Sequence, residues 1–371
     1  MWHFTSISLD HANGVQVATN PFVVLNFLTE SVSRSEHELE EAILPASTPG
    51  AMKTAELLAE VYGHVLEKPV MYTQGVALSG RLRLSNLRSE TEKITGEISQ
   101  VVEAYSESSH EIFNSQDGTA NFAGLCWADE LFEITNDQRY FDIAIFAADL
   151  FGPTVDEGPL DPDLRVEDIF FAGTMLGRAF KLSGNERYIE LLVDFLNGFS
   201  TLQSNGLWWH CVASPYFWGR GNAFAALGFA EALSYIPDQH PDRNALLEIH
   251  VRHLEGLRNY QDESGMWRQV VDLKSTYLEH SATTMIGYAI TRGLNHGWLG
   301  SEWKATADLA WSGASKRIGP NGELEQVCVG TGPQPDLQAY IDRKFSLGRD
   351  DRGGSMALWF AVERAVSEQT G

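Results

Sequence analysis

The chain has 371 residues, of which 43% are hydrophobic, and a net charge of -23 at pH 7. A chain of this length can bury one large core or two ordinary ones. The negative charge repels phosphate groups, so we expect no nucleic acid and no anionic membrane as a partner.

The cysteines and the N-terminal sequence indicate a compartment. Cys126, Cys211 and Cys328 are few, odd in number and widely spaced, which is typical of free thiols under reducing conditions. The opening stretch MWHFTSISLDHANGVQ lacks the basic segment and apolar run of a signal peptide, and no segment has the apolar length of a membrane span. We therefore expect a soluble cytoplasmic protein.

From residue 51 onward the pattern predicts helices separated by short loops. One kind of helix is rich in small apolar residues, and it is expected at 74–84, 122–134, 168–182, 222–235, 281–291 and 354–365. A second, more charged kind alternates with it, and it is expected at 89–105, 138–151, 185–199, 242–260 and 302–317. This alternation predicts an inner and an outer ring of helices.

Glycines recur inside or at the start of the small-residue helices, for example Gly173 and Gly228. Glycine within a helix costs about 1 kcal/mol relative to alanine, so its repeated use suggests that these helices approach one another closely. Five full pairs and one partial pair fit a closed toroid of six helical hairpins. We predict one all-α domain with negligible sheet.

The stretch SPYFWGRGNAFAALGFAE, residues 214–231, is a candidate binding site at the start of one inner helix. Glycines on both sides leave the Arg220 guanidinium uncrowded, and Trp218 offers a flat face for a sugar ring. Asn222 is expected to cap the helix. The alternative is a structural arginine paired with a nearby aspartate.

Other candidate groups precede the neighbouring inner helices. Asp168 begins a helix whose remainder is apolar, where burial would raise its pKa as a general acid requires, although an acid there can simply complement the helix dipole. His210 precedes the 222–235 helix. Gln269, Tyr277 and Glu279 precede the 281–291 helix, and such amide, aromatic and carboxyl groups are typical of saccharide pockets.

Five motifs occur in a fixed order: EDIFFAGTMLGRAFKLSGNERY, WGRGN, GMWRQVVD, YLEHSATTMIGYAITRG and VCVGTGP. In this order the chain resembles the unsaturated glucuronyl and rhamnogalacturonyl hydrolases of glycoside hydrolase families 88 and 105. The resemblance spans about residues 70–365, and 1–50 is expected to be a variable N-terminal segment of the same domain. It implies an (α/α)6 barrel.

The resemblance also implies a reaction. Family substrates carry a 4,5-unsaturated uronic acid at the non-reducing end; an aspartic acid protonates C4 and water adds at C5. By resemblance that acid is Asp168, whose carboxylate then accepts the proton of the water. No metal or cofactor is implied. His250 and His253 have a spacing of three but are expected to be solvated on an outer helix.

Two positions depart from the family pattern. The family's second active-site aspartate has no clear match, with Asp117 the nearest carboxylate and Asn121 the nearest polar side chain. Arg268 stands where the family commonly has histidine. Both departures bear on the choice of substrate more than on the reaction.

Three alternatives remain open at this point. A conventional glycosidase would use two carboxyls, Asp168 and Glu279; a sugar epimerase would need paired histidines, and His210 lacks an obvious partner. A non-catalytic sugar-binding protein would keep Trp218 and Arg220 but would not need the acid. The expected ligand is an unsaturated uronic-acid oligosaccharide, and the expected assembly is a monomer or homodimer.

Overall fold

The computed structural model describes residues 50–106, 112–114, 117–152 and 164–370, which all fall in one compact unit, Thr48–Gly371. The N-terminal segment predicted over residues 1–50 lies outside the described residues, apart from Gly50. No helix in the described ranges is both long enough and apolar enough to span a membrane.

Within these ranges, an inner ring of six helical segments surrounds a central axis. Five of its members are continuous helices, and the second member is broken into three short pieces. The segments are α4 (Tyr72–Arg88), α6 (Thr119–Phe122) with η2 (Ala123–Leu125) and α7 (Ala128–Thr135), α9 (Val166–Ser183), α11 (Gly219–Tyr235), α13 (His280–Asn295) and α16 (Asp351–Thr370).

An outer ring of amphipathic helices covers the inner one, again counting only described residues. Its members are α3 (Ala51–Val61), α5 (Thr91–Ser106), α8 (Gln138–Asp149), α10 (Arg187–Gly198), α12 (Arg243–Arg258) and α14 (Lys304–Ser315). Helix α3 packs against α16 and completes the hairpin that was incomplete in the predicted pattern.

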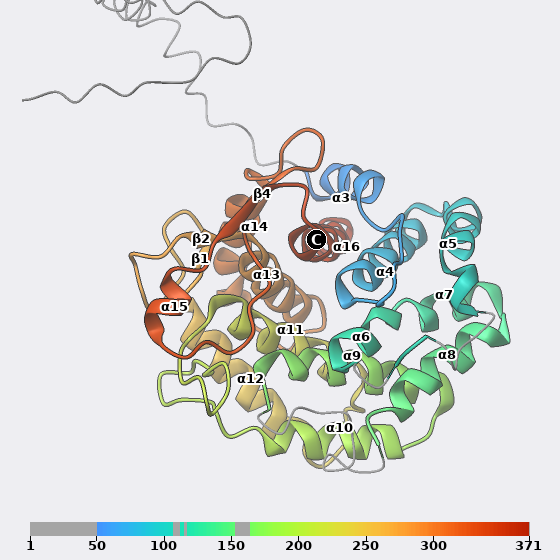
Figure 1. Ribbon diagram of the computed structural model, residues 1–371, viewed down its shortest axis with the longest axis horizontal. Coiled ribbons are helices and arrows are strands. Elements are labelled where there is room, and N and C mark those ends of the chain that lie inside the picture. The colour runs from blue at the N-terminus through green and yellow to red at the C-terminus, as the bar shows by residue number, and fades with distance from the viewer. Residues whose placement is uncertain (1–49, 107–111, 115–116, 153–163, 371) are drawn as a thin grey trace, which may run out of the picture. The chain divides into compact units, whose positions relative to one another are not determined.

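The chain closes on itself. Helix α16 at the end of the chain packs against α4 near its beginning, and α9, α11 and α13 complete the contacts around the ring (Figure 1). The predicted all-α toroid of six hairpins is therefore confirmed. The second inner helix, predicted to run unbroken from 122 to 134, is instead interrupted, and Trp127 Nε1 donates to the carbonyl of Gly124 in the break at 3.1 Å.

Close helix approach explains two of the glycines. A Cβ atom at Gly228 would lie 2.5 Å from the backbone of Ile169 and Phe170 on α9, and one at Gly173 would lie 2.9 Å from the carbonyl oxygen of Gly228. These distances are shorter than any ordinary contact, so α9 and α11 can pack as they do only because both positions lack a side chain.

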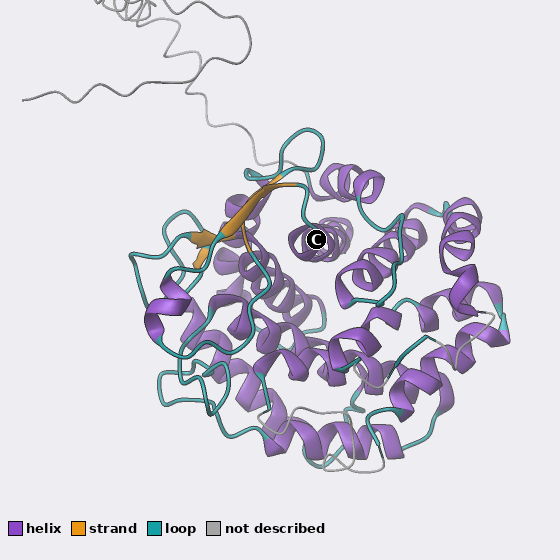
Figure 2. Cartoon of the chain, in the orientation of Figure 1, coloured by secondary structure: helices purple, strands orange, loops and turns teal. Residues whose placement is uncertain are grey.

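Strands are minor in the described part of the chain. β1 (Trp267–Arg268) pairs with β2 (Leu278–Glu279), and β3 (Leu324–Cys328) pairs with β4 (Phe345–Gly348), both antiparallel. Figure 2 shows both sheets on one side of the ring, next to α13 and α14. Together with the short helices η4 (Ser301–Trp303) and α15 (Leu337–Ile341), they form the connections after α12.

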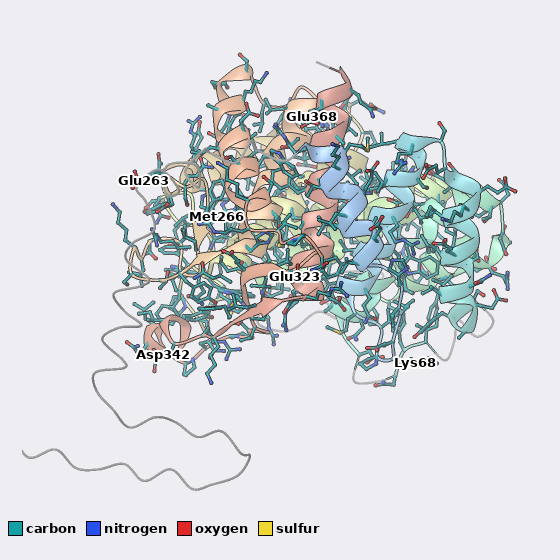
Figure 3. The ribbon with its side chains drawn as sticks, turned by 90° about the horizontal axis from the view of Figure 1, so that it is seen from above. Lys68, Glu263, Met266, Glu323, Asp342 and Glu368 are labelled. Carbon is teal, nitrogen blue, oxygen red and sulfur yellow. The ribbon has the colours of Figure 1, made fainter. Side chains whose placement is uncertain are left out.

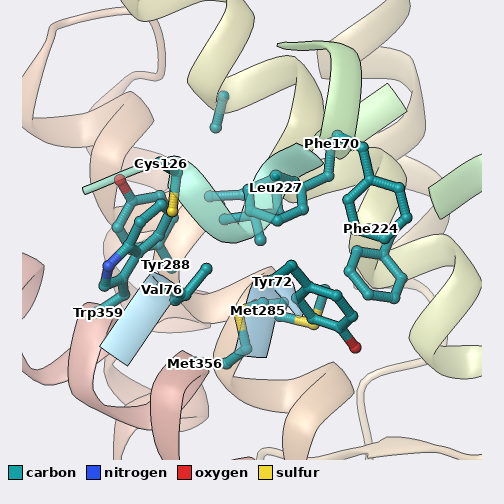
Figure 4. Packing of buried hydrophobic residues seen from close by; sticks show 14 of the residues in the cluster. Tyr72, Val76, Cys126, Phe170, Phe224, Leu227, Met285, Tyr288, Met356 and Trp359 are labelled. Carbon is teal, nitrogen blue, oxygen red and sulfur yellow. The ribbon is translucent and has the colours of Figure 1, made fainter. Parts of the chain in front are cut away.

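Aromatic side chains fill the middle of the ring. Phe170 lies with its ring centroid 5.9 Å from that of Phe224 and 6.0 Å from that of Trp359, and Tyr72 contacts Phe224 at 5.5 Å (Figure 4). Such edge-to-face and offset pairs add to the burial of apolar area. The axis of the barrel is thus a packed core.

Beyond this aromatic layer lies a buried ionic cluster. Arg178 contacts Asp129 at 2.5 Å, Glu130 at 3.0 Å and Glu231 at 3.4 Å. Burial tends to raise the pKa of Glu231, but the charges of Arg83 and Arg178 outweigh it and lower the pKa to about 2. This cluster ties α7, α9 and α11 together.

Candidate active site

A pocket of about 510 Å³ opens where several inner helices begin. Its lining comes from the first turns of α4, α6, α9 and α11 and from the loop after β3. The lining residues are Tyr72, Asp117, Gly118, Thr119, Ala120, Arg165, Glu167, Asp168, Phe171, Trp218, Arg220, Phe224, Gly330 and Thr331. Figure 3 shows Lys68, four residues before α4, at the same end of the barrel as Asp342, with Glu368 at the opposite end.

Asp168 lies in the first turn of α9 and is 3% exposed. Its Oδ1 accepts a 2.6 Å hydrogen bond from the hydroxyl of Thr119, and its Oδ2 accepts one of 3.2 Å from the backbone N–H of Arg165. Burial, together with the charge of Glu167, raises the pKa of Asp168 to about 7. A carboxyl group with this pKa can both donate and accept a proton near neutral pH.

The segment before α6 supplies the residues closest to the family's second aspartate. Asp117 lines the pocket and accepts a 3.0 Å hydrogen bond from the backbone N–H of Asn114. Asn121 is turned to the backbone instead, since it accepts from Gly118 N at 2.9 Å and donates to Val70 O at 2.7 Å. The group that contacts Asp168 from this segment is Thr119.

Trp218 and Arg220 both line the pocket, and each is 2% exposed. The guanidinium lies 5.1 Å from the centroid of the Trp218 ring and donates to the carbonyl oxygens of Cys328 and, at 2.7 Å, Val329. Arg220 therefore fixes the start of the loop that carries Gly330 and Thr331 into the pocket. It is held by carbonyl groups and not by the acid of the structural alternative.

His210 lies behind the pocket and does not line it. Its Nε2 is 3.3 Å from Glu167 Oε1, and its Nδ1 is 2.5 Å from the hydroxyl of Tyr340. The ring lies 4.6 Å from the ring of Trp218. His210 thus contacts two residues that line the pocket, Glu167 and Trp218.

Gln269, Tyr277 and Glu279 lie outside the pocket lining. Glu279 is the N-cap of α13, where its carboxylate accepts from Ala282 N at 2.5 Å, Ser281 Oγ at 2.8 Å and Cys328 N at 2.9 Å. Fully buried and surrounded by donors, it joins α13 to β3 and is not among the residues that line this pocket.

The other two belong to the wall around the site. Tyr277 donates to Lys344 O at 3.3 Å and packs on the Phe345 ring. Gln269 is fully buried, and its backbone carbonyl accepts from Gly219 N at 2.7 Å at the start of α11. Through this backbone bond, Gln269 fixes where α11 begins.

Two sequence-based expectations about individual residues are wrong. Asn222 does not cap α11, because the helix already begins at Gly219; its amide instead bonds Trp208 N and O at 2.8 and 2.9 Å. His250 and His253 are not solvated but fully buried, and His253 bonds Asn222 O at 3.0 Å. Burial lowers the pKa of His250 to about 3.

Among the described residues, no three His, Cys, Asp or Glu side chains gather as a metal-binding group. The pocket lining offers carboxyl, hydroxyl, guanidinium and aromatic groups.

Sequence reasoning missed Thr119 and Tyr72, the latter at the first position of α4. Both residues could have been found from their positions, because functional side chains are expected where inner helices begin. Tyr72 is the first residue of α4, and Thr119 is the first residue of α6. The sequence signal is more conspicuous from α9 onward, where tryptophan and charged residues stand at the helix starts.

Comparison with known proteins identifies the family. The model described as Glycosyl Hydrolase Family 88 matches residues 59–367. The chain is 31% identical over 134 residues to an unsaturated 3S-rhamnoglycuronyl hydrolase of Alteromonas sp. (strain LOR), covering 34% of this chain and 32% of that protein. It is 25% identical over 234 residues to the unsaturated rhamnogalacturonyl hydrolase YesR of Bacillus subtilis (strain 168), covering 57% and 66%. The matched parts thus span a third and just under two thirds of these relatives.

Solved structures share the fold. A possible member of the GH105 family from Salmonella enterica serovar Paratyphi A superposes with a TM-score of 0.74 at 19% identity, covering 86% of this chain and 94% of that one. The unsaturated glucuronyl hydrolase of Bacillus sp. GL1 gives a TM-score of 0.60 at 16% identity, covering 83% and 92%. These similarities, with the helix order described above, establish an (α/α)6 barrel.

Proposed function

Because the chain belongs to Glycosyl Hydrolase Family 88, we propose that it removes a 4,5-unsaturated uronic acid from the non-reducing end of oligosaccharides released by polysaccharide lyases. The observation that carries this proposal is Asp168, a buried carboxyl group whose pKa of about 7 keeps a transferable proton available at neutral pH. A pocket of about 510 Å³ suits one or two sugar rings.

The reaction is a hydration. The carboxyl proton of Asp168 passes to C4 of the double bond, and positive charge develops at C5 and the ring oxygen. Water then adds at C5 while the Asp168 carboxylate accepts one of its protons, which restores the acid. The hemiketal at C5 opens to a ketone, and the bond from C1 to the remaining saccharide breaks as its oxygen takes a proton.

The pocket offers a place for each part of the ring. We assign the sugar ring to the side of Trp218, whose side chain lines the pocket, and the substrate carboxylate to the side of Arg165 and Arg220. Because the chain carries a net charge of -23, long-range attraction of a uronate is unfavourable, so binding depends on these short-range contacts.

The alternatives receive less support. Glu279, the second carboxyl of the conventional glycosidase, accepts hydrogen bonds from backbone N–H groups of α13 and β3 and does not line the pocket. His210, the residue considered for an epimerase, lies behind Glu167. A sugar-binding protein without activity would not require a buried carboxyl group at the pocket.

The experiment is a direct assay of the double bond. The protein is incubated with lyase-generated disaccharides, including rhamnose-containing ones because the names of both relatives refer to them, and ultraviolet absorbance and reducing sugar are followed together. We expect absorbance to fall as sugar is released, and Asp168→Asn to lose about 10²–10⁴ in kcat with binding retained. Release from matched saturated uronides at a comparable rate, with unsaturated absorbance unchanged, would contradict the hydration reaction.

We also propose that the protein acts in the cytoplasm, as a monomer or homodimer, on fragments that have been imported. Fractionation of the source cells and light scattering of the purified protein test these two points.

A further inference from the structure

Two carboxyl groups that are adjacent in sequence line the same pocket. Successive residues of a helix point about 100° apart, so neighbours do not normally share a site. Here Asp168 turns back to Arg165 N at 3.2 Å, while Glu167, whose side chain is 13% exposed, reaches His210. The first turn of α9 therefore presents two carboxyls, of which the proposed reaction uses one.

A directed chain of hydrogen bonds stands behind Glu167. The backbone N–H of Gln334 donates to Tyr340 Oη at 3.2 Å, and Tyr340 Oη lies 2.5 Å from His210 Nδ1. The Tyr340 hydroxyl has one proton to donate, and we assign His210 Nδ1 as its acceptor. In this assignment Nε2 carries a proton and donates it to Glu167 Oε1 at 3.3 Å.

The imidazole ring is held in place on all sides. His210 is fully buried, its backbone oxygen accepts from Val166 N at 3.0 Å, and its N–H donates to Tyr216 O at 3.0 Å. Trp218 covers the ring at 4.6 Å. These contacts join the backbone of His210 to the start of α9 and bury its ring against Trp218.

The two carboxyls face a limited set of other titratable or charged groups. These groups come from α4, from the segment before α6, from the loop before α9, from α11 and from the loops behind the pocket. They are Tyr72, Asp117, Arg165, Arg220, His210 and Tyr340. Of the two arginines, Arg220 has its charge directed to the carbonyls of Cys328 and Val329.

We propose that Glu167 is a positioning residue that keeps Asp168 in its proton-donating form, and that His210 and Tyr340 hold Glu167 as the carboxylate that does so. The proposal rests on the proposed function, in which Asp168 is the proton donor. A negative charge next to a carboxyl opposes its ionisation, and Glu167 is, after burial, the second cause that raises the pKa of Asp168. His210 contacts Glu167 through Nε2 and so fixes the position of its carboxylate beside Asp168.

The variant Glu167→Gln tests this inference, because it removes the charge and keeps the shape. The first readout needs no substrate: the side-chain ¹³C signal of Asp168 is titrated in labelled protein and assigned with Asp168→Asn. We expect the midpoint to fall by about 1–2 pH units, because removing a like charge that lines the same pocket makes the carboxyl easier to ionise. Tyr340→Phe, which removes the donor to Nδ1, should shift the midpoint in the same direction by a smaller amount.

The second readout is the pH profile of kcat/KM on an unsaturated disaccharide. Its alkaline limb should move to lower pH by the same amount, and the rate should recover when the variant is assayed at lower pH. Glu190→Gln on the exposed side of α10 is the matched control and should change neither readout.

The outcomes separate the two proposals. An unchanged Asp168 midpoint in Glu167→Gln, or an equal loss of rate at every pH, overturns the positioning role. A shifted Asp168 midpoint supports the positioning role of Glu167, whether or not the enzyme acts on unsaturated uronides. If neither the wild type nor Glu167→Gln acts on them, only the proposed reaction is overturned.

Discussion

The hydroxyl of Thr119 donates a 2.6 Å hydrogen bond to Asp168 Oδ1, and this contact joins the start of α6 to the start of α9 inside the pocket. A donor to a carboxylate favours the ionised form and lowers its pKa. Thr119 therefore acts on Asp168 in the sense opposite to burial and to the charge of Glu167.

Replacement of Thr119 by valine should make Asp168 a weaker acid. Valine has nearly the same shape but no hydroxyl, so the pKa of Asp168 should rise and the alkaline limb of kcat/KM should move to higher pH. Thr119→Ser keeps the hydroxyl and should leave the limb near its original position. A downward movement of the limb in Thr119→Val would show that the hydroxyl does not stabilise the carboxylate.

The raised pKa of Asp168 also predicts how stability depends on pH. Between pH 3.8 and about 7 the folded protein keeps a proton that the unfolded chain releases, so this contribution is complete at low pH and is lost as pH rises. Asp168→Asn carries no such proton. As pH rises through this window, the wild type should therefore lose free energy of unfolding relative to Asp168→Asn. The difference should reach a few kcal/mol, at about 1.4 kcal/mol per pKa unit. Urea unfolding at pH 4.5 and pH 8 measures the difference, and a constant offset would contradict it.

The contact between α9 and α11 predicts a large effect of one methyl group. In Gly228→Ala the new Cβ would meet the backbone of Ile169 and Phe170 at 2.5 Å, so α9 must shift, at a cost of about 1–3 kcal/mol or more. The control is Gly96→Ala on α5, where nothing lies within 4 Å. This second change should stabilise the helix by about 1 kcal/mol. Thermal unfolding of both variants, if it gave equal midpoints, would show that the ring is not tightly packed there.

The ionic cluster beyond the aromatic layer predicts strong dependence on one arginine. Arg178→Met leaves Asp129, Glu130 and Glu231 without their shared cation, and breaking such a buried cluster costs about 3–5 kcal/mol. Arg139→Met removes the exposed pairs to Glu103 and Asp137 and should cost at most about 1 kcal/mol. Chemical unfolding at neutral pH measures the loss of stability in both variants. Similar losses in Arg178→Met and Arg139→Met would contradict the view that burial makes the ionic cluster important for stability.

The fold could be predicted from the sequence because small-residue and charged helices alternate in it. The alternation indicates which helices are buried in the inner ring and which face solvent. Glycines such as Gly228 indicate where helix backbones approach each other closely. The break in the second inner helix could not be predicted in this way, because residues 122–128 (FAGLCWA) stay apolar through it. The break lies where Gly124 packs against Val70 and Met71, a contact between segments far apart in sequence.

The site was predictable in part for a related reason. Asp168, Trp218 and Arg220 begin inner helices and line the pocket, as expected from their positions. Glu279 also begins an inner helix, but its carboxylate folds back to cap that helix. Sequence cannot separate these two uses of an acid at a helix start, because the choice depends on where Cys328 N lies in the folded chain.

The packed axis of the barrel has a consequence for the order of events. Phe170, Phe224 and Trp359 fill the space between the pocket and the ionic cluster, so the pocket has a mouth and a floor. For the proposed reaction, the terminal sugar occupies the deep position and the rest of the saccharide extends outward through the mouth. Only chain ends can then react, and the outer product must depart before the inner one. The enzyme must release the saccharide after every turnover and is therefore distributive, and an excess of the outer product should inhibit it by trapping the ring-opened sugar product inside.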